Sequence, residues 1–370
     1  MKRISLFFGN FNSGGVQRVR LILAKGFLER GFFVDIVVVN SRGALRKQVP
    51  VGANIIDLGA RSALASLPAL TRYLRRKKPD AILSAQTHHN ITAIWARRLS
   101  GVSARLIVGE HNNLQEVVKY STFRNQLRPL AARLIYPGAD AILAVSKGVA
   151  DALSVTSGIK RADIHVIYNP VMLSDIQKRI QEGPEHPWQK QKHIPVIIAV
   201  GSLREQKDYP TLIKAFAKAR ANRSMRLIIL GEGRCREQLQ TLINKLNLAE
   251  DVHLKGNVAN PYIYMQHADL YVLSSRWEGF PNALLEALAC GAPIVATDCP
   301  SGPAEMLENG RYGHLVPVGD EDALAEAIQK TLDFPPSSIL LKKRASEFSL
   351  EVICEQYLRL LVPHYENTAN

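Results

Sequence analysis

The sequence predicts an α/β protein with two doubly wound parallel sheets. Short apolar runs of strand length alternate with helix-length segments over residues 1–170, this alternation stops over residues 171–193, and it starts again at Pro195. Alternating strands and helices favour a parallel sheet with helices on both faces. We therefore expect two domains that face a cleft, with ligands bound at the carboxyl ends of both sheets.

The expected strands of the first domain, residues 1–170, are short and mostly apolar. They are Arg3–Phe8, Val34–Val39, Ile55–Leu58, Ala81–Ser84, Arg105–Gly109, Ala141–Val145 and His165–Ile167. A polar glycine loop, Asn10–Gly15, follows the first strand and leads into a helix over Val16–Arg30, which Gly31 ends. Helical stretches separate most of the later strands.

Residues 171–193 lose apolar periodicity and gather proline, glycine and charge, which predicts a linker. The pattern then repeats over residues 194–348. The expected strands there are Pro195–Val200, Arg226–Leu230, Val252–Leu254, Leu270–Leu273, Pro293–Thr297 and Gly313–Pro317. The expected helices are Tyr209–Ala221, Arg236–Leu246, a helix between Pro281 and Gly291, Asp322–Leu332 and most of Ile339–Leu361.

The composition indicates a globular protein in a reducing compartment. Cys235, Cys290, Cys299 and Cys354 form no CxxC pair and have no histidine at metal-ligand spacing, so we expect free thiols. The apolar run Ile4–Phe8 is only of strand length, which argues against a signal peptide, and no run approaches the ~18 residues of a membrane span. We expect a cytoplasmic protein.

The positive charge lies in the first half of the chain. The formal net charge is +14, and residues 1–170 contain 25 lysines and arginines against 9 acidic residues, whereas the remainder contains 22 against 24. This asymmetry indicates an anionic partner for the first half, either nucleic acid or an acidic membrane surface. A basic face that only confers solubility is the alternative.

Two glutamates flank the start of a helix in the stretch from Leu270 to Pro303. Glu278 lies in the loop after a strand, and Glu286 lies eight residues later among small and apolar neighbours. We expect this helix to be buried almost all round, where a carboxylate is costly unless it is hydrogen-bonded. The simpler interpretation is that Glu278 merely precedes the helix and Glu286 pairs with a basic neighbour.

The N-terminus of the same helix favours anions, because its first amides have no partner within the helix. Gly279, Phe280 and the turn beyond Pro281 lie there, between the two glutamates. This stretch thus has an acid in the loop, a phosphate-binding turn and an acid in the helix. Such an arrangement suits a ligand that has hydroxyls at both ends and phosphate between them. A nucleotide-sugar is such a ligand.

The residue order supports the nucleotide-sugar interpretation. The segment from Glu278 to Thr297 reads E-G-F-P-N-A-L-L-E-A-L-A-C-G-A-P-I-V-A-T. It resembles the E-x7-E segment of retaining glycosyltransferases of the GT-B fold, specifically the large family four group. The resemblance implies two Rossmann-like domains and a final helix, within residues 349–370, that crosses back to the first domain.

The resemblance also assigns donor-binding roles in this stretch. It implies that Glu286 holds the ribose diol and that Glu278 holds the hydroxyls of the donor sugar. The turn of Gly279, Phe280, Pro281 and Asn282 would bind the diphosphate.

Two polar segments of the first domain match the same family. The S-G-G-x-x-R pattern at residues 13–18 resembles the loop that borders the donor diphosphate and the acceptor, which makes Gly15 and Arg18 candidates. A tight turn is the alternative. The segment from Gly109 to Asn112 resembles the G/S-E-H-N segment, whose histidine faces the transferred sugar, so His111 is a catalytic candidate. A structural histidine is the alternative.

A loop of the second domain carries cations that would neutralise a leaving diphosphate. The family reads G-R-L-x-x-x-K there; Lys207 takes the place of the lysine, but Ser202 stands where the arginine is normal. Arg204 is two residues further on and is our candidate for the second cation, with a solvated surface charge as the alternative. Gly231 and Val258 follow strands and would line the nucleobase pocket in a family member.

Residues 120–136 combine arginines with an aromatic and aliphatic face. We expect a surface helix there that Pro129 breaks or kinks, with Arg124, Arg128 and Arg133 near a lipid headgroup layer. An ordinary amphipathic helix packed on its own domain is the alternative.

These observations predict a retaining hexosyltransferase that uses a UDP- or GDP-sugar. The charge of the first half favours a polyprenyl-diphosphate-linked saccharide as acceptor, in bacterial envelope glycan synthesis, and peripheral association with the anionic inner face of the cytoplasmic membrane. We expect no metal and no cofactor, because the cations on which the family relies are side chains, and Lys207 is of this kind.

Two other classes of protein remain open on the sequence. A nucleic-acid-binding protein on a doubly wound scaffold would need aromatics placed for base stacking, and aromatics are 7% and unclustered. We therefore expect no nucleic acid partner. A phosphorylase or epimerase of the GT-B fold would need a pyridoxal lysine or a different set of acids, and neither is visible.

Overall fold

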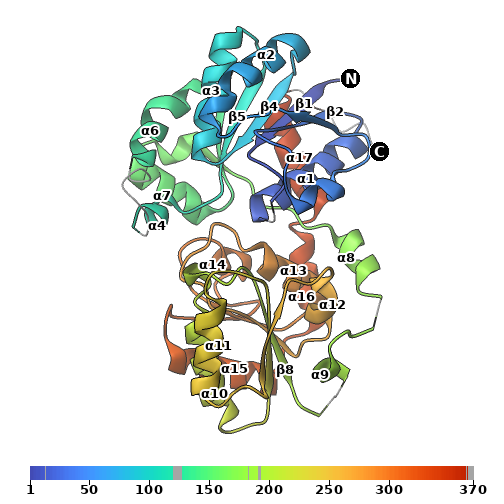
Figure 1. The fold of residues 1–370 in the computed structure, drawn as a ribbon, viewed down its shortest axis with the longest axis vertical. Helices are drawn as coiled ribbons and strands as arrows, with labels where there is room; N and C mark the ends of the chain where they lie inside the picture. The colour runs from blue at the N-terminus through green and yellow to red at the C-terminus, as the bar shows by residue number, and fades with distance from the viewer. Residues whose placement is uncertain (13, 120–126, 182, 191–192, 364, 366–370) are drawn as a thin grey trace. The chain divides into compact units, whose positions relative to one another are not determined.

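The computed structural model describes residues 1–12, 14–119, 127–181, 183–190, 193–363 and 365 (Figure 1). The chain forms two compact units. Unit 1 is Met1–Pro170 together with Leu350–Asn370, and unit 2 is Val171–Ser349.

Unit 1 is built on a seven-stranded sheet of order β3-β2-β1-β4-β5-β6-β7, in which neighbouring strands run parallel. Its strands are β1 (Arg3–Phe8), β2 (Phe33–Val38), β3 (Asn54–Asp57), β4 (Ala81–Ala85), β5 (Arg105–Glu110), β6 (Ala141–Ala144) and β7 (Ile164–Val166). The strand order reverses between β1 and β4. Loops that leave the carboxyl ends of the strands near this switch point are the expected place for ligands.

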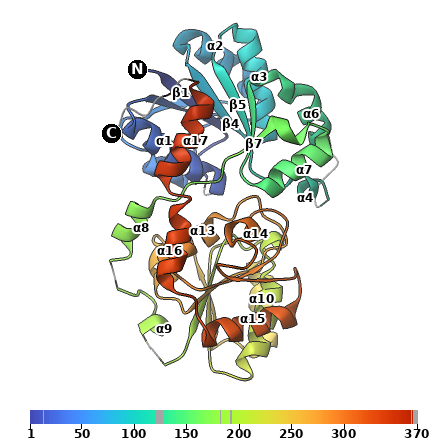
Figure 2. The same cartoon turned by 180° about the vertical axis from the view of Figure 1, so that it is seen from behind.

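Helices cover both faces of this sheet (Figures 1 and 2). They are α1 (Gly15–Glu29), α2 (Leu67–Lys77), α3 (Thr87–Ser100), α4 (Leu114–Lys119), α6 (Arg128–Ile135), α7 (Lys147–Ser157) and α17 (Leu350–Leu361), with short 3-10 turns at Ala44–Gln48, Leu64–Ser66, Tyr136–Gly138 and Arg161–Asp163. The order of strand and helix agrees with the predicted fold class.

The last helix, α17, belongs to unit 1, as the fold class predicts. It lies beside α1 in both views (Figures 1 and 2). The two helices approach closely because Gly26 has no side chain: a Cβ there would lie 2.8 Å from Leu350 Cδ1 and 2.9 Å from Cys354 Sγ. Arg105 Nε also donates to the Leu360 carbonyl at 2.7 Å.

Unit 2 is built on a six-stranded parallel sheet of order β10-β9-β8-β11-β12-β13. Its strands are β8 (Val196–Val200), β9 (Arg226–Leu230), β10 (Val252–Gly256), β11 (Leu270–Leu273), β12 (Ile294–Thr297) and β13 (His314–Val316). Its helices are α8 (Leu173–Arg179), α9 (Pro187–Lys190), α10 (Tyr209–Arg220), α11 (Arg236–Lys245), α12 (Pro261–Gln266), α13 (Asn282–Cys290), α14 (Pro303–Met306), α15 (Glu321–Asp333) and α16 (Ser338–Ser346), with a 3-10 turn at Glu205–Lys207.

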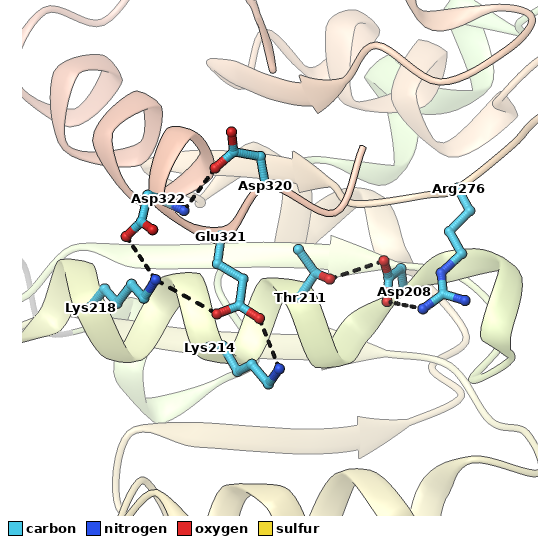
Figure 3. Close-up of polar contacts among 8 residues, drawn as sticks. All are labelled: Asp208, Thr211, Lys214, Lys218, Arg276, Asp320, Glu321 and Asp322. Carbon is cyan, nitrogen blue, oxygen red and sulfur yellow. Dashed lines mark hydrogen bonds and ion pairs between the residues drawn. The ribbon is translucent and has the colours of Figure 1, made fainter. Parts of the chain in front are cut away.

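The core on one face of this sheet is formed by buried aliphatic residues of the strands with α10, α11 and α15. Ion pairs join α10 to α15 at its edge: Lys214 to Glu321 at 2.8 Å and Lys218 to Asp322 at 2.7 Å (Figure 3). Asp320 caps α15, because its Oδ1 accepts hydrogen bonds from the amides of Asp322 and Ala323. These exposed ion pairs connect α10 to α15 on the surface of unit 2.

Residues 171–193, predicted as a linker, contain the two helices α8 and α9. Ile176 of α8 is 2% exposed, and Arg179 Nη2 donates to the Ala259 carbonyl at 2.6 Å. One buried side chain in α8 and none in α9 give no apolar period that could be recognised in the sequence, so local packing on unit 2 decides the structure here.

No helix in the described part of the chain is both long enough and apolar enough to cross a lipid bilayer.

Candidate active site

Two loops of unit 2 lie side by side at its topological switch point. One leaves β8 and the other leaves β11, and these two strands are neighbours in the sheet, with Leu270 opposite Ile197. The first loop contains Lys207, and the second contains Glu278. The fold therefore brings together two predicted site residues that are 71 positions apart in the sequence.

Lys207 and Glu278 form an ion pair. Nζ of Lys207 lies 2.5 Å from Oε1 of Glu278, and the two side chains are only 15% and 8% exposed. Ser275 Oγ donates to the same carboxylate oxygen at 2.7 Å. A largely desolvated pair of this kind is stable only when its remaining polar atoms are satisfied, so both charges are held at a fixed position.

Backbone contacts fix the two loops to each other. The amide of Arg276 donates to the Gln206 carbonyl at 2.8 Å, and the Gln206 side-chain amide donates to the Trp277 carbonyl at 2.8 Å. Ser274 Oγ donates to the Lys207 carbonyl at 2.7 Å. The main chain on both sides of the ion pair is therefore anchored, which preorganises Lys207.

Asp208 completes this arrangement from a strained backbone position. Its φ of 46° is in the left-handed region, which is rare for a residue other than glycine. Its carboxylate accepts from Thr211 Oγ1 at 2.9 Å and from Arg276 Nη2 at 3.2 Å (Figure 3). These two bonds hold the chain as it turns from Lys207 into α10.

The turn at the start of α13 is shaped by close packing. Pro281 is the N-cap residue of this helix, and the Glu278 amide donates to the Pro300 carbonyl at 3.2 Å. Gly302 has φ of 101°, and a Cβ there would lie 2.5 Å from Pro281 Cδ and 3.3 Å from Phe280 Cα. Gly279, Phe280 and Asn282 are thus held at a helix N-terminus, where an anion is favoured.

Glu286 is less buried than the sequence predicts. Leu284, Leu285 and the four residues from Ala287 to Cys290 are buried, but Asn282, Ala283 and Glu286 form a partly exposed stripe along α13. Tyr262 Oη approaches Glu286 Oε1 at 3.5 Å. The expectation of a helix buried almost all round was wrong on this stripe, because residues at i and i+4 lie on the same side of a helix.

Arg204 is exposed and lines a pocket of about 90 Å³ with Asp208, Gln238 and Arg276. Neither Lys207 nor Glu278 is among the described residues that line this pocket. Arg276 brings a second guanidinium to it from the β11 loop. That residue was not singled out in the sequence, although its place two residues before Glu278 was a possible signal.

The candidate nucleobase loops lie next to the Lys207 loop. The Gly231 amide donates to the Gly256 carbonyl at 2.8 Å, and the Leu203 amide donates to the Glu232 carbonyl at 3.0 Å. Gly231 has φ of 138°, and a Cβ there would lie 2.0 Å from the Gly201 carbonyl oxygen. Only glycine permits this approach. Val258, two residues after Gly256, is partly exposed at the same edge.

In unit 1, Gly15 is the first residue of α1, and both Gly15 and Arg18 are exposed in its first turn. His111 directly follows β5 and is 6% exposed. Its Nε2 lies 3.1 Å from Nη2 of Arg20, a fully buried residue of α1. Burial and the positive charge of Arg20 lower the pKa of His111 well below its ordinary value.

Sequence reasoning missed Arg20. Its position is one residue after Val19 and three before Leu23, on the buried side of α1. An arginine inside the apolar stripe of a helix is unusual, and that was the available signal.

The basic helix of unit 1 is described only from residue 127 onward. Arg124 lies outside the described residues. Arg128 is partly buried and Arg133 is exposed on α6, and Pro129 lies in its first turn, where a missing N–H removes no helical bond. Within the described residues, no group of three or more His, Cys, Asp or Glu side chains is arranged to hold a metal ion.

The fold and the position of these loops define a class of enzyme. Two doubly wound parallel-sheet units, a final helix that returns to the first, and polar loops at both switch points are the architecture of GT-B glycosyltransferases. Two family models match: Glycosyltransferase Family 4 over residues 13–175 and Glycosyl transferases group 1 over residues 184–348. The chain belongs to family 4 of the glycosyltransferases.

Similar proteins agree with this assignment. The chain is 30% identical over 345 residues to the Campylobacter jejuni N-acetylgalactosamine-N,N'-diacetylbacillosaminyl-diphospho-undecaprenol 4-alpha-N-acetylgalactosaminyltransferase, with 90% of this chain and 91% of that one covered. It is 28% identical to the Rhizobium meliloti lipopolysaccharide core biosynthesis glycosyltransferase LpsE, covering 98% of this chain and 99% of that one.

Solved structures show the same fold. The crystal structure of Anabaena HepE in complex with UDP and glucose superposes with a TM-score of 0.78 at 21% identity, over 98% of this chain and 99% of that one. The structure of a Rickettsia africae glycosyltransferase gives 0.81 at 18% identity, over 98% and 99% of the two chains.

Proposed function

We propose that this glycosyltransferase moves a hexose or N-acetylhexosamine from a UDP- or GDP-sugar to a hydroxyl of a polyprenyl-diphosphate-linked saccharide, with retention of anomeric configuration, in bacterial envelope polysaccharide synthesis. The ion pair between Lys207 Nζ and Glu278 Oε1, at the entrance of α13, carries the donor half of this proposal. It places one fixed cation and one fixed carboxylate next to a helix N-terminus.

In the proposed donor complex, Lys207 and the Gly279–Asn282 turn hold the diphosphate. Glu278 and Glu286 bind the hydroxyls of the donor sugar and of the ribose. Charge on the diphosphate grows as the bond to the sugar breaks, and a preorganised cation lowers the barrier most when it is already in place. The loop contacts of Gln206 and Ser274 support this role, because they fix Lys207 before any ligand binds. Crystal structures of Anabaena HepE with UDP and glucose, on the same fold, support a uridine donor.

The proposed reaction needs no side-chain nucleophile. The acceptor oxygen forms a bond to the anomeric carbon on the face from which the diphosphate departs, and the acceptor proton passes to a diphosphate oxygen. His111 contacts the transferred sugar and the acceptor. Metal independence is part of the proposal, because Lys207 supplies the positive charge that a divalent cation would otherwise bring.

Two lines support a lipid-linked acceptor. The printed name of the Campylobacter jejuni relative specifies a diphospho-undecaprenol acceptor, and that of the Rhizobium meliloti relative specifies lipopolysaccharide core synthesis. The second line is the surface of α6, where Leu130 and Leu134 are 54% and 71% exposed next to the exposed Arg133.

Helix α3, which packs against α6, also carries exposed apolar side chains. Trp95 and Leu99 are exposed there, and the Arg98 guanidinium lies 5.7 Å from the centre of the Trp95 ring. Exposed aliphatic and aromatic side chains among arginines are the composition of a face that enters the headgroup layer of an anionic membrane.

The donor half is tested with purified protein and a panel of UDP- and GDP-sugars, with release of the nucleoside diphosphate as the readout. Lys207→Ala should lower kcat/KM about 100-fold or more, because one transition-state contact of this kind contributes on the order of 10²–10³. Glu286→Ala should act mainly on KM, since it removes binding that is equal in ground and transition states. Lys214→Ala, an exposed lysine of the same unit paired with Glu321, is the matched control and should keep full activity.

Rates like those of the wild type in both Lys207→Ala and Glu286→Ala would contradict the assignment of the donor site. The anomeric proton coupling in the NMR spectrum of the product reports retention or inversion directly. Activity that EDTA abolishes and Mg²⁺ restores would overturn metal independence.

A further inference from the structure

Arg20 is a buried charge without a carboxylate partner among the described residues. It is 0% exposed, Nη2 donates to the Ser84 carbonyl at 3.1 Å, and Nε and Nη1 have no hydrogen-bond partner there. A guanidinium in such a position costs folding free energy that an apolar side chain would not. Residues that destabilise the fold in this way are often kept for the chemistry of a nearby group.

The nearby group is His111. The distance from Arg20 Nη2 to His111 Nε2 is 3.1 Å, which is a hydrogen bond. A guanidinium has only donors, so the imidazole must accept through the lone pair of Nε2. A neutral ring that accepts at Nε2 has its proton on Nδ1.

The ring also has to remain neutral. A second proton on His111 would have to bind Nε2, directly against the Arg20 guanidinium, and would place two cations in contact inside a buried site. Burial and the Arg20 charge both lower the pKa of His111. Among the described residues no hydrogen bond to Nδ1 is formed, so its N–H is available to a ligand.

Gly109 leaves space for the Arg20 guanidinium beside His111. A Cβ on Gly109 would lie 3.2 Å from Arg20 Nη2 and 3.1 Å from the Ser84 carbonyl oxygen. Tyr357 of α17 lies on another side of the guanidinium; burial raises the pKa of this tyrosine, and the charge of Arg20 opposes the rise. Among the described residues, the polar groups found beside Arg20 are His111, Ser84 and Tyr357, and none of them carries a carboxylate.

We propose that Arg20 is a positioning residue for His111: it fixes the Nδ1–H tautomer and makes this histidine a hydrogen-bond donor to the transferred sugar or acceptor. His111 cannot then serve as a general base, because its only lone pair is occupied by Arg20. The role toward sugars rests on the proposed function, whereas the tautomer does not. A histidine that only donates a hydrogen bond agrees with a reaction in which the leaving diphosphate takes the acceptor proton.

The tautomer is measured on the unliganded full-length protein by long-range ¹H–¹⁵N NMR of ¹⁵N-histidine side chains, with His111→Asn to assign the signal. The expected spectrum shows a protonated Nδ1 and an unprotonated Nε2 that do not titrate between pH 5 and 8. An Nε2–H tautomer, or a ring that becomes an imidazolium in this range, would overturn the proposal.

Variants separate positioning from mere packing. Arg20→Lys keeps a donor without a lone pair and should preserve the tautomer, whereas Arg20→Met should yield mixed tautomers and a titrating ring. For the nucleotide-sugar that the wild type uses, Arg20→Met should lower kcat about 10-fold with little change in KM, the size of one lost hydrogen bond. Lys25→Met, at a partly exposed position on the same helix that pairs with Glu29, is the control.

Each outcome has a distinct meaning. The expected tautomer without any sugar transfer would contradict the proposed function and leave the Arg20–His111 assignment standing. Sugar transfer by a protein whose His111 carries its proton on Nε2 would contradict the Arg20–His111 assignment and leave the proposed function standing. If Arg20→Met does not fold, the wild-type spectrum and Arg20→Lys still decide the proposal.

Discussion

At the scale of single residues, buried ionisable groups cluster where β5 ends. Glu110, the residue before His111, is 1% exposed and accepts hydrogen bonds from Tyr136 Oη and Asn90 Nδ2. Burial raises the pKa of Glu110 from 4.5 to about 7, although the hydrogen bond from Tyr136 opposes this rise. The folded protein thus favours the neutral carboxyl group over a range of pH in which the unfolded chain is ionised.

Glu110 therefore makes stability depend on pH. Because its folded pKa is raised, its contribution is fully present below about pH 4.5 and is lost as the pH rises through about 7. The loss amounts to about 3 kcal/mol, at 1.36 kcal/mol per pKa unit. Glu110→Gln should raise the unfolding temperature at pH 8 and leave it nearly unchanged at pH 4.5, as measured by circular dichroism, with Glu250→Gln on the surface as control. If the wild type and Glu110→Gln unfold at the same temperature at pH 8, this account of Glu110 is wrong.

At the scale of elements, the short helix α9 is attached to unit 2 by a histidine pair. His186 Nε2 lies 2.9 Å from His253 Nδ1, and the Arg226 guanidinium lies over the Trp188 ring at 5.0 Å. Burial, followed by the charges of His253, Lys255 and Arg226, lowers the pKa of His186 to about 4. Protonation of both rings would place like charges in contact.

The attachment of α9 should weaken in acid. Because the folded pKa of His186 is depressed, the stability it contributes is present above the ordinary histidine value of 6.5 and is lost as the pH falls towards about 4. Hydrogen exchange of residues 185–190, corrected for intrinsic rates, should accelerate at pH 4.5 relative to pH 7, while β9 stays protected. His186→Phe keeps an aromatic ring and should remove the difference; an unchanged exchange rate in the wild type would disprove the coupling.

Elements with strong patterns were predicted well. The strands Arg3–Phe8, Arg226–Leu230 and Leu270–Leu273 have the predicted bounds, because each is a short apolar run between glycine and polar loops, which leaves little choice of where the strand starts and ends.

The helices of residues 171–193 were missed, because their stability comes from contacts with unit 2. Lys207 and Glu278 were both predicted, but their direct ion pair required the strand order, which determines that β8 and β11 are neighbours.

At the scale of the whole molecule, the uneven charge and the exposed face of α3 and α6 lead to one prediction. The part of the chain up to residue 170 carries the excess of basic residues, and its apolar side chains at Leu130 and Leu134 are exposed. Charge attracts the protein to an anionic surface, and the inserted side chains retain it there.

We expect the protein to sediment with vesicles of phosphatidylglycerol and phosphatidylcholine and to dissociate at high salt. Replacing both Leu130 and Leu134 by Gln should weaken binding about 10-fold or more, because two partly buried leucines contribute on the order of 1.5–3 kcal/mol together. Val155→Gln, at a 74% exposed position on α7 of the same unit, is the matched control. Two results would contradict the proposed membrane-binding face: wild-type binding that is as strong to neutral as to anionic vesicles, or a double variant that binds as strongly as the wild type.

The place of α17 has a consequence for how the protein is made. Residues 350–361 pack against α1 of unit 1, so this unit is completed only by a segment that is synthesised after the whole of unit 2. Tyr357, which lies against Arg20, is on that segment. The buried surroundings of His111 are therefore complete only after translation has passed through the whole of unit 2. A nascent chain that stalls before residue 350 lacks Tyr357, one of the groups beside Arg20.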